Sequence, residues 1–333
     1  IQVLIAWDFP LSELFFCRGL DIRVPEIVKP NRGKIVVCQK FFEIAGSEKV
    51  DWKKITDEKN HQMISDAVDK VLKDYDNEAL EGSARNSFIT SQVREIATKT
   101  VKVLVNHIRS GKFEPVEYEI PLEHGIVDRI DTYETDDKLY VKVIDYKSGK
   151  VTFDITKAYH GTQMQLLVYM NDAVNYEQKS HEKEVLPAAG LYFNIKDPFV
   201  QMDKISNIVE DYRTTHPEDD RTDEQILDEL IFEKQLPEFQ MSGIVNTEEQ
   251  VVTAVDEVLE QGNKSQIVKL TKKKDGDPDS HSQALDQETY MKLIQYVSGK
   301  ADEMKEQLFQ GNIQLNPVEE ACTYCAYKGI CKF

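Results

Sequence analysis

Two aspartates and a lysine are spaced as metal-dependent hydrolysis would require. Asp128 lies in one predicted strand, and Asp145 lies near the end of the next, in the run Val-Ile-Asp-Tyr-Lys-Ser-Gly over residues 143–149. Because paired strands lie about 4.8 Å apart, the two carboxylates can converge on one hard cation, for which Mg²⁺ or Mn²⁺ is suited. Lys147 falls two residues beyond Asp145 and therefore on the same strand face. Its ammonium can there orient or help deprotonate a water molecule, or stabilise charge on a phosphate oxygen.

The residues around this group have different expected roles. Asp131 points to the opposite face of its strand, so we expect a structural role, paired with Arg129 or a neighbour. Gln165 and Tyr169 are four residues apart and share one face of a predicted helix beside the site. Glu119, in the preceding strand, can be either a site residue or a carboxylate that faces solvent, and the spacing leaves both interpretations open.

Three of the five cysteines crowd the carboxy-terminal end of the chain as Cys322, Cys325 and Cys331. The spacing Cys-x2-Cys-x5-Cys needs a fourth ligand to close a tetrahedral thiolate site. In a long acidic chain with no secretion signal, this crowding favours metal or cluster ligation over disulfides. Zinc, an iron–sulfur cluster and unliganded buried thiols all remain open on the spacing alone.

Hydrophobic periodicity predicts the elements that must position these residues. Apolar residues at three- and four-residue steps predict helices over about 57–76, 86–110, 156–174, 248–260 and 287–310. Alternating or continuous apolar runs predict strands over about 116–120, 125–133, 139–146, 188–195 and 267–271. The acidic turn residues Asp136 and Asp137 predict a hairpin between the second and third strands. Residues 1–50 show weak periodicity, and we assign no element there.

Composition limits the class of protein. The 333 residues are 41% hydrophobic, which is enough for a buried core and excludes a wholly disordered chain. The 41 basic and 59 acidic residues give a net charge of −18, which excludes attachment to nucleic acid by blanket cationic attraction. Much of the acidity lies in residues 203–236, which we expect to be a solvated surface insertion. The sequence contains no transmembrane-length apolar run and no Gly-x4-Gly-Lys-[Ser/Thr] phosphate loop.

Three motifs together resemble a known family. Gly-x-x-Asp at 125–128, Ile-Asp-Tyr-Lys-Ser-Gly at 144–149 and Gln-x-x-x-Tyr at 165–169 resemble the motif set of the RecB-like branch of the PD-(D/E)xK nuclease superfamily. With the apolar run 187–193 and Ile-Lys-Asp-Pro at 195–198, residues 51–333 look most like the C-terminal nuclease domains of AddB subunits of AddAB helicase–nucleases. The resemblance implies an α/β, restriction-endonuclease-like core, with a mixed central sheet flanked by helices, an acidic insertion and an iron–sulfur-stapled C-terminus.

The resemblance also implies an activity. It points to a Mg²⁺- or Mn²⁺-dependent DNA exonuclease that processes DNA ends and single strands in double-strand-break repair and recombination, beside an AddA-like helicase–nuclease subunit. The implied catalytic residues are Asp128, Asp145, Lys147, Gln165 and Tyr169. The implied metal ligands are Asp128, Asp145, the backbone carbonyl of Tyr146 and, less firmly, Glu119.

AddB-like and Cas4-like nucleases carry a [4Fe–4S] cluster built from one early and three terminal cysteines. Here the implied ligands are Cys17, Cys322, Cys325 and Cys331, with Cys38 as the competing early ligand. The cluster would join the two ends of the domain and act structurally, because DNA hydrolysis transfers no electrons. The sequence departs from the family at one point: the family has a metal-assisting histidine in a helix after the early cysteine, but residues 18–50 contain none. The nearest histidine, His61, is interpreted as a surface residue.

We therefore expect four segments in the chain. They are an N-terminal segment with the early cysteine (1–50), helices plus the nuclease core (51–200), the insertion with accessory helices and strands (201–310), and the cysteine-rich, cluster-binding end (311–333). The alternatives are a non-catalytic DNA-guiding module of the same complex, favoured by the missing histidine, and a Cas4-like exonuclease, disfavoured by the long segment after residue 198.

Location and DNA affinity can also be predicted from the sequence. The first residue is isoleucine, so we expect a piece of a longer polypeptide, and the absence of a signal-peptide pattern predicts a cytoplasmic location. Lysines 142, 147, 150 and 157 make residues 142–157 locally positive. We expect this piece alone to bind DNA weakly and with strong salt dependence.

Overall fold

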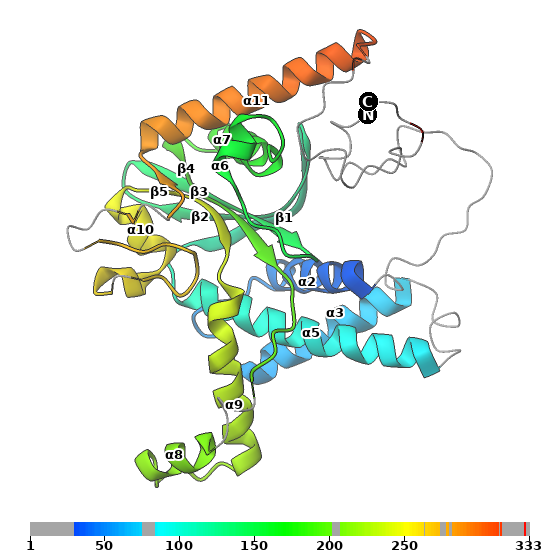
Figure 1. Cartoon of the computed structure of the whole chain (residues 1–333), viewed down its shortest axis with the longest axis vertical. Coiled ribbons are helices and arrows are strands. Elements are labelled where there is room, and N and C mark those ends of the chain that lie inside the picture. The colour runs from blue at the N-terminus through cyan, green and yellow to red at the C-terminus, as the bar shows by residue number, and fades with distance from the viewer. Residues whose placement is uncertain are drawn as a thin grey trace.

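A six-stranded mixed sheet forms the centre of the fold (Figure 1). The computed structural model describes residues 30–74, 84–201, 207–262, 264–273, 278–279, 282–312, 314 and 330. The strands, in both chain and spatial order, are β1 (Glu114–Leu122), β2 (Gly125–Glu134), β3 (Lys138–Lys147), β4 (Glu184–Asn194), β5 (Ser242–Asn246) and β6 (Ala284–Leu285). β1, β2 and β3 are antiparallel neighbours, whereas β3 and β4 run parallel. β5 is antiparallel to β4, and β6 is parallel to β5.

The two central strands explain the long apolar runs of the sequence. All but the end residues of β3 and β4 are buried, as expected for strands that are covered on both faces. The β2–β3 hairpin predicted at the acidic turn is confirmed. Since β3 and β4 are parallel, the chain between them must cross over the sheet, and it does so through α6 (Ile155–Tyr159) and α7 (Gln165–Ser180).

Helices cover both faces of the sheet (Figure 1). α2 (Pro30–Ser47), α3 (Asp57–Asp74) and α5 (Ala84–Arg109) pack together and share one hydrophobic core with the sheet. α7 and α11 (Gln287–Phe309) share the second core, on the other side. The predicted helices over 57–76, 86–110 and 287–310 thus correspond to α3, α5 and α11. Among the described residues, no helix has the length and apolar character needed to cross a membrane.

The acidic stretch forms two helices that project from the body of the molecule (Figure 1). These are α8 (Ile208–Thr215) and α9 (Asp223–Gln235), followed by the short 3-10 helix η3 (Leu236–Phe239). α8 is exposed or half-buried along its length, and α9 buries Ile226 and Gln235. Because charged side chains dominate this stretch, it remains solvated while the sheet supplies the core.

Several elements differ from those predicted. α2 was not predicted, although its buried Val37, Phe41 and Ile44 recur at helical spacing. The single helix expected over 156–174 is divided into α6 and α7, because Gly161 adopts a left-handed φ of 92° between them. The predicted helix over 248–260 is α10 (Glu249–Val255) and the 3-10 helix η4 (Glu257–Glu260), separated by Asp256 in an extended conformation.

The strand predicted over residues 267–271 is wrong. Only isolated bridges occur there among the described residues, such as the one between Met241 and Val268. The Ser265 hydroxyl accepts hydrogen bonds from the backbone N–H groups of Ile267 and Val268, so the chain turns. These apolar residues are therefore buried by a turn rather than by pairing, while the short strands β5 and β6, which complete the sheet, were not predicted.

Candidate active site

Three carboxylates lie side by side across the first three strands. The register of the neighbouring strand pairs places Glu119 of β1 opposite Asp128 of β2, and Asp128 opposite Asp145 of β3. Side chains of directly opposite residues in antiparallel strands are neighbours on one face. The backbone N–H of Tyr146 also donates a 2.6 Å hydrogen bond to Asp128 Oδ2. We call Glu119, Asp128 and Asp145 the carboxylate row.

Glu119 enters this row through an unusual backbone conformation. Its φ of 47° is in the left-handed region, which costs a non-glycine residue about 1–3 kcal/mol and persists only where the surroundings enforce it. The preceding residue, Tyr118, stacks on Phe42 of α2 at a ring-centroid distance of 5.8 Å. Packing of α2 on β1 therefore holds the strand at this point. Backbone strain at a carboxylate row favours a site role for Glu119 over a role as a solvent-facing carboxylate.

The carboxylate row carries more negative charge than its protein surroundings balance. Burial and the charges of Asp145 and Glu119 raise the pKa of Asp128 well above its usual value, although the N–H of Tyr146 and the charge of Lys147 act in the opposite direction. Burial raises the pKa of Glu119 to about 7 together with the charges of Glu43 and Asp145, against the hydrogen bond from Gln39. A divalent cation with oxygen ligands would remove this repulsion, so the donor set fits Mg²⁺ or Mn²⁺.

Lys147 is held beside the row by contacts from three elements. Its Nζ lies 2.8 Å from Asp145 Oδ2 and donates a 2.8 Å hydrogen bond to Gln165 Oε1 of α7. Gln165 Nε2 in turn donates to the Tyr169 hydroxyl at 3.2 Å. Nζ also lies 5.2 Å from the ring centroid of Tyr192 on β4. The structure thus brings the predicted catalytic residues together in one place.

A close contact explains the glycine that begins β2. A Cβ atom built on Gly125 would lie only 2.6 Å from the Tyr169 hydroxyl oxygen. Only glycine lets the start of β2 approach α7 this closely. The Gly-x-x-Asp spacing therefore brings the strand that bears Asp128 against the helix that bears Gln165.

The opposite face of the same strands carries a buried ion-pair cluster. Arg129 donates two hydrogen bonds to Asp131, at 2.6 and 2.7 Å, and Lys142 Nζ lies 2.9 Å from the second carboxylate oxygen. The structural role predicted for Asp131, paired with Arg129, is confirmed. Lys142 is buried, so the sequence was misleading where it grouped Lys142 with a locally positive stretch near the site.

The Tyr146 side chain belongs to this second face. Its ring stacks on Phe42 at 6.3 Å, and its hydroxyl accepts a 3.3 Å hydrogen bond from Arg129. Only the backbone of Tyr146 therefore adjoins the carboxylate row. This placement is compatible with a role for its carbonyl group and not for its phenol.

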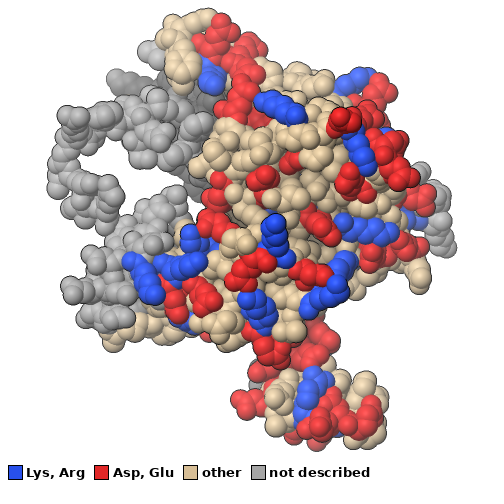
Figure 2. Space-filling model, turned by 180° about the vertical axis from the view of Figure 1, so that it is seen from behind, with Lys and Arg blue, Asp and Glu red and all other residues tan. Residues whose placement is uncertain are grey.

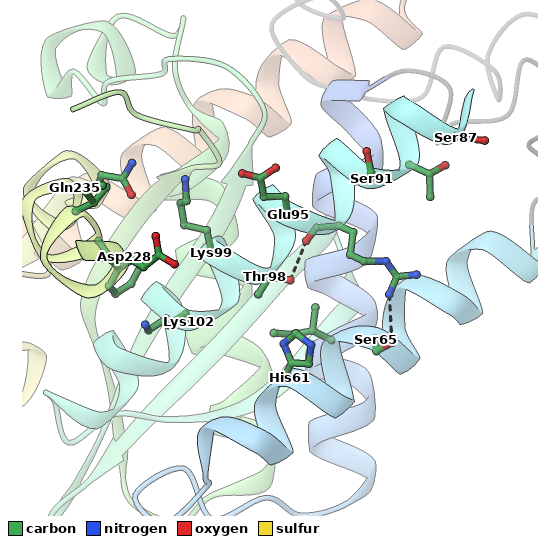
Figure 3. Close-up of a pocket in the computed structure, with 15 residues that line it drawn as sticks. His61, Ser65, Ser87, Ser91, Glu95, Thr98, Lys99, Lys102, Asp228 and Gln235 are labelled. Atoms are coloured by element: carbon green, nitrogen blue, oxygen red, sulfur yellow. Dashed lines mark hydrogen bonds between the residues drawn. The ribbon is translucent and has the colours of Figure 1, made fainter. Parts of the chain in front are cut away.

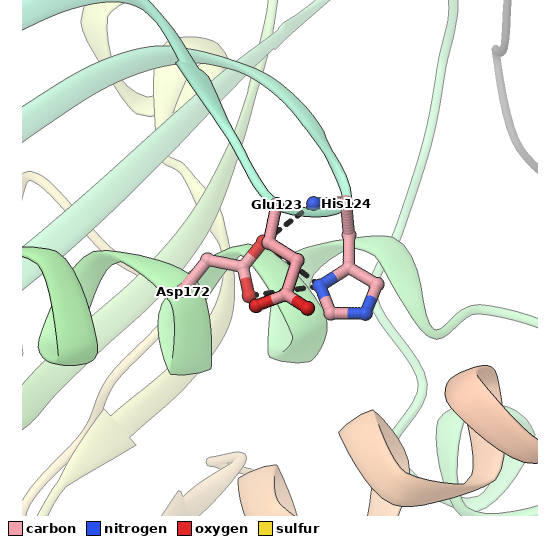
Figure 4. A group of neighbouring side chains, drawn as sticks. All are labelled: Glu123, His124 and Asp172. Atoms are coloured by element: carbon pink, nitrogen blue, oxygen red, sulfur yellow. Dashed lines mark hydrogen bonds and ion pairs between the residues drawn. The ribbon is translucent and has the colours of Figure 1, made fainter.

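His124 joins three elements next to the site. Its Nδ1 lies 2.9 Å from Asp172 Oδ1 on α7, and its Nε2 lies 2.9 Å from Asp302 Oδ1 on α11 (Figure 4). Burial acts to lower the pKa of His124, but its hydrogen bonds to Asp302 and Asp172 outweigh burial and raise it. Glu123 lies beside this group but is exposed. Both ring nitrogens face carboxylates, so His124 acts as an ion-paired link between the β1–β2 turn and two helices, which its position at a strand end did not reveal.

The reasoning from sequence missed Gln39. This α2 side chain donates a 2.7 Å hydrogen bond to Glu119 Oε1 and a 3.4 Å hydrogen bond to Asp128 Oδ1. The helical spacing of the buried residues around Gln39 could have predicted α2, but not its contact with β1. His61, the nearest histidine to the expected position, lies exposed on α3, as its surface interpretation predicted.

The largest surface groove lies away from the carboxylate row. Its volume is about 810 Å³, and within the described parts its lining comes from α3, α5 and α9 (Figure 3). Arg94, Lys99 and Lys102 contribute its basic side chains. Arg94 is paired with Asp69, and Lys99 with Asp197. The groove is thus separate from the candidate active site and is only weakly basic.

Surface charge is mixed where Figure 2 shows it. Acidic and basic side chains alternate over this face, and neither sign dominates. Such a surface agrees with the net charge of −18 and with the prediction of weak, salt-dependent DNA binding by this chain alone.

The expected cluster ligands Cys17, Cys322, Cys325 and Cys331 lie outside the described residues. Cys38, the competing early ligand, is completely buried in α2 within the first hydrophobic core. Burial raises the pKa of its thiol to about 12. Iron ligation requires a thiolate, which this environment disfavours.

The fold and site together define a class of protein: an α/β protein with carboxylates, a lysine and a glutamine gathered at one end of a mixed sheet. The sequence model of the PD-(D/E)XK nuclease superfamily matches residues 25–332, and the chain belongs to this superfamily. The resemblance inferred from three short motifs is thereby confirmed.

Relatives with high similarity are named as subunits of an ATP-dependent helicase/deoxyribonuclease, the enzyme type to which AddB belongs. The Lachnoclostridium phytofermentans protein is 30% identical over 92% of this chain and 27% of its own length. The proteins of Clostridium perfringens strain SM101 and Clostridium acetobutylicum are both 28% identical, over 95% and 94% of this chain. The chain spans about 28% of the length of the first of these and about 27% of the second.

Proposed function

We propose that this chain is the nuclease part of a helicase–nuclease subunit and hydrolyses phosphodiester bonds at DNA ends. The observation that carries the proposal is the convergence of Asp128, Asp145 and Lys147 in a chain of the PD-(D/E)XK nuclease superfamily. The name of the relatives combines a helicase with a deoxyribonuclease and describes one subunit of that enzyme. It supports an AddA-like partner subunit and a role in double-strand-break repair and recombination.

Asp128, Asp145 and the backbone carbonyl of Tyr146 would hold Mg²⁺ or Mn²⁺, with Glu119 as a further ligand. A bound divalent cation supplies an acidified water molecule and offsets charge on the phosphate. The protein residues do the rest. Asp145 and Gln165 hold the Lys147 ammonium in place, where it orients the attacking water or stabilises a phosphate oxygen. Tyr169 holds Gln165, and so fixes the lysine from α7.

Degradation of end-labelled linear DNA, single-stranded and duplex, tests the proposal with and without Mg²⁺ or Mn²⁺. We expect cation-dependent hydrolysis that falls by at least about 100-fold in Asp145→Ala and Lys147→Ala. Lys150→Ala is the matched control, because Lys150 is exposed and lies beyond the end of β3. Equal activity in all three variants would exclude this active site. DNA binding without hydrolysis by the wild type would select the non-catalytic guiding module instead.

We propose further that Cys17, Cys322, Cys325 and Cys331 hold a [4Fe–4S] cluster. The buried, protonated state of Cys38 supports the choice of Cys17 as the early ligand. Anaerobic purification with iron, zinc and sulfide analysis tests the assignment. We expect about four iron atoms per chain, lost in Cys17→Ser and retained in Cys38→Ser. Zinc in place of iron, or loss of iron only in Cys38→Ser, would contradict it.

A further inference from the structure

Gln39 is the only amide side chain that contacts the carboxylate row from the helical layer, among the contacts of the described residues. Its Nε2 lies 2.7 Å from Glu119 Oε1 and 3.4 Å from Asp128 Oδ1, so one amide group connects two of the three carboxylates. The side chain is half-buried. An amide N–H₂ has two donors, and a hydrogen bond to an ionised carboxylate is stronger than one between neutral groups.

The position of Gln39 is set by the packing of its helix. Its neighbours Cys38 and Phe41 are completely buried, so this part of α2 has little freedom to rotate or slide. One turn further on, Phe42 stacks on Tyr118, the residue that precedes Glu119. Gly46 allows the same tyrosine to approach closely, since a Cβ there would lie 2.7 Å from the ring. α2 is therefore fixed against β1 at the point where β1 bears the strained glutamate.

The strain at Glu119 shows why such a contact matters. A glutamate with a φ of 47° leaves this conformation unless other contacts hold it. Without a donor on its carboxylate, repulsion from Asp128 would drive the Glu119 side chain away from the row. The Gln39 amide opposes both tendencies, because it adds no charge and bonds to both carboxylates.

We propose that Gln39 is a positioning residue of the metal site, which holds Glu119 and Asp128 in a ligating arrangement before the cation binds. This role rests on the proposed function and deepens it. It assigns to α2, through a neutral amide, the preorganisation of ligands supplied by β1 and β2. Residues that orient metal ligands typically contribute 10–100-fold to metal affinity.

Calorimetric titration of the full chain with Mn²⁺ tests the proposal. Gln39→Met keeps the length and helix propensity of the side chain but removes its donors. We expect its Kd for Mn²⁺ to be about 10–100-fold higher than that of the wild type. The matched control is Gln62→Met, which removes an amide–carboxylate bond of 2.9 Å to Asp66 within exposed α3 and should leave the Kd unchanged. Circular dichroism verifies that the variants are folded.

A double-mutant cycle with Glu119→Gln separates positioning from general packing. If Gln39 acts through Glu119, adding Gln39→Met to Glu119→Gln should weaken Mn²⁺ binding much less than adding it to the wild type. An unchanged Kd in folded Gln39→Met, or full additivity in the cycle, would overturn the role of Gln39 while leaving the metal site intact. Should Gln39→Met fail to fold, Gln39→Leu replaces it under the same criteria. Wild-type protein that binds no Mn²⁺ would overturn the metal site itself, and the role of Gln39 with it.

Discussion

Cation binding by the carboxylate row is expected to depend strongly on pH near neutrality. The pKa of Glu119 is raised to about 7, so its carboxyl group is roughly 90% ionised at pH 8 and roughly 10% ionised at pH 6. A carboxylate must lose its proton to bind a cation. The apparent Kd for Mn²⁺ should therefore rise about tenfold from pH 8 to pH 6 through Glu119 alone. Asp128, whose pKa is also raised, adds to the change in the same direction.

The same shift predicts how the metal-free protein responds to pH. Because the pKa of Glu119 is raised from 4.5 to about 7 on folding, the folded chain holds more protons than the unfolded chain in this window. Stability contributed by the protonated carboxyl group is therefore present below pH 4.5 and lost as the pH rises through 7. A bound cation should reverse this loss, since it stabilises the ionised row.

Calorimetry at pH 6, 7 and 8, in buffers of different ionisation enthalpy, measures both the Kd and the protons released. We expect proton release on Mn²⁺ binding at pH 6 and much less at pH 8. Glu119→Gln should flatten the pH dependence, whereas Glu114→Gln, at an exposed position of the same strand, should not. An equal Kd at pH 6 and pH 8 without proton release would refute the reasoning.

Three further predictions concern the structure around the site. Asp131→Ala should lower the free energy of unfolding by about 3–5 kcal/mol in urea denaturation, because it strands buried Arg129, whereas Asp136→Ala in the exposed turn should have little effect. Gly125→Ala should reduce both nuclease activity and Tm, and combination with Tyr169→Phe should restore part of the Tm; a normal Tm in Gly125→Ala would contradict the close contact. His124→Gln should lower Tm most at about pH 6 and least at high pH, because stability from a raised histidine pKa is lost as the pH rises through it; a difference independent of pH would argue against the charged link.

The sequence by itself determined the strands that bear the chemistry and the side on which each residue lies. Alternation put Asp145 and Lys147 on one face and Asp131 on the other, and the structure agrees, because the strand period of two leaves no freedom once a face is buried. The motif at 165–169 likewise predicted neighbours on one face of a helix, and Gln165 and Tyr169 are hydrogen-bonded.

Only the tertiary structure decided which distant residues complete the site. Gln39 precedes Glu119 by 80 positions and meets it because α2 packs on the edge strand β1. The strain at Glu119 and the link from His124 to Asp302 on α11 also arise from packing between elements. Local periodicity carries no information about such contacts, since they depend on how helices and strands are arranged around a shared core. The carboxylate row was therefore readable from the sequence, whereas the residues that hold it in place were not.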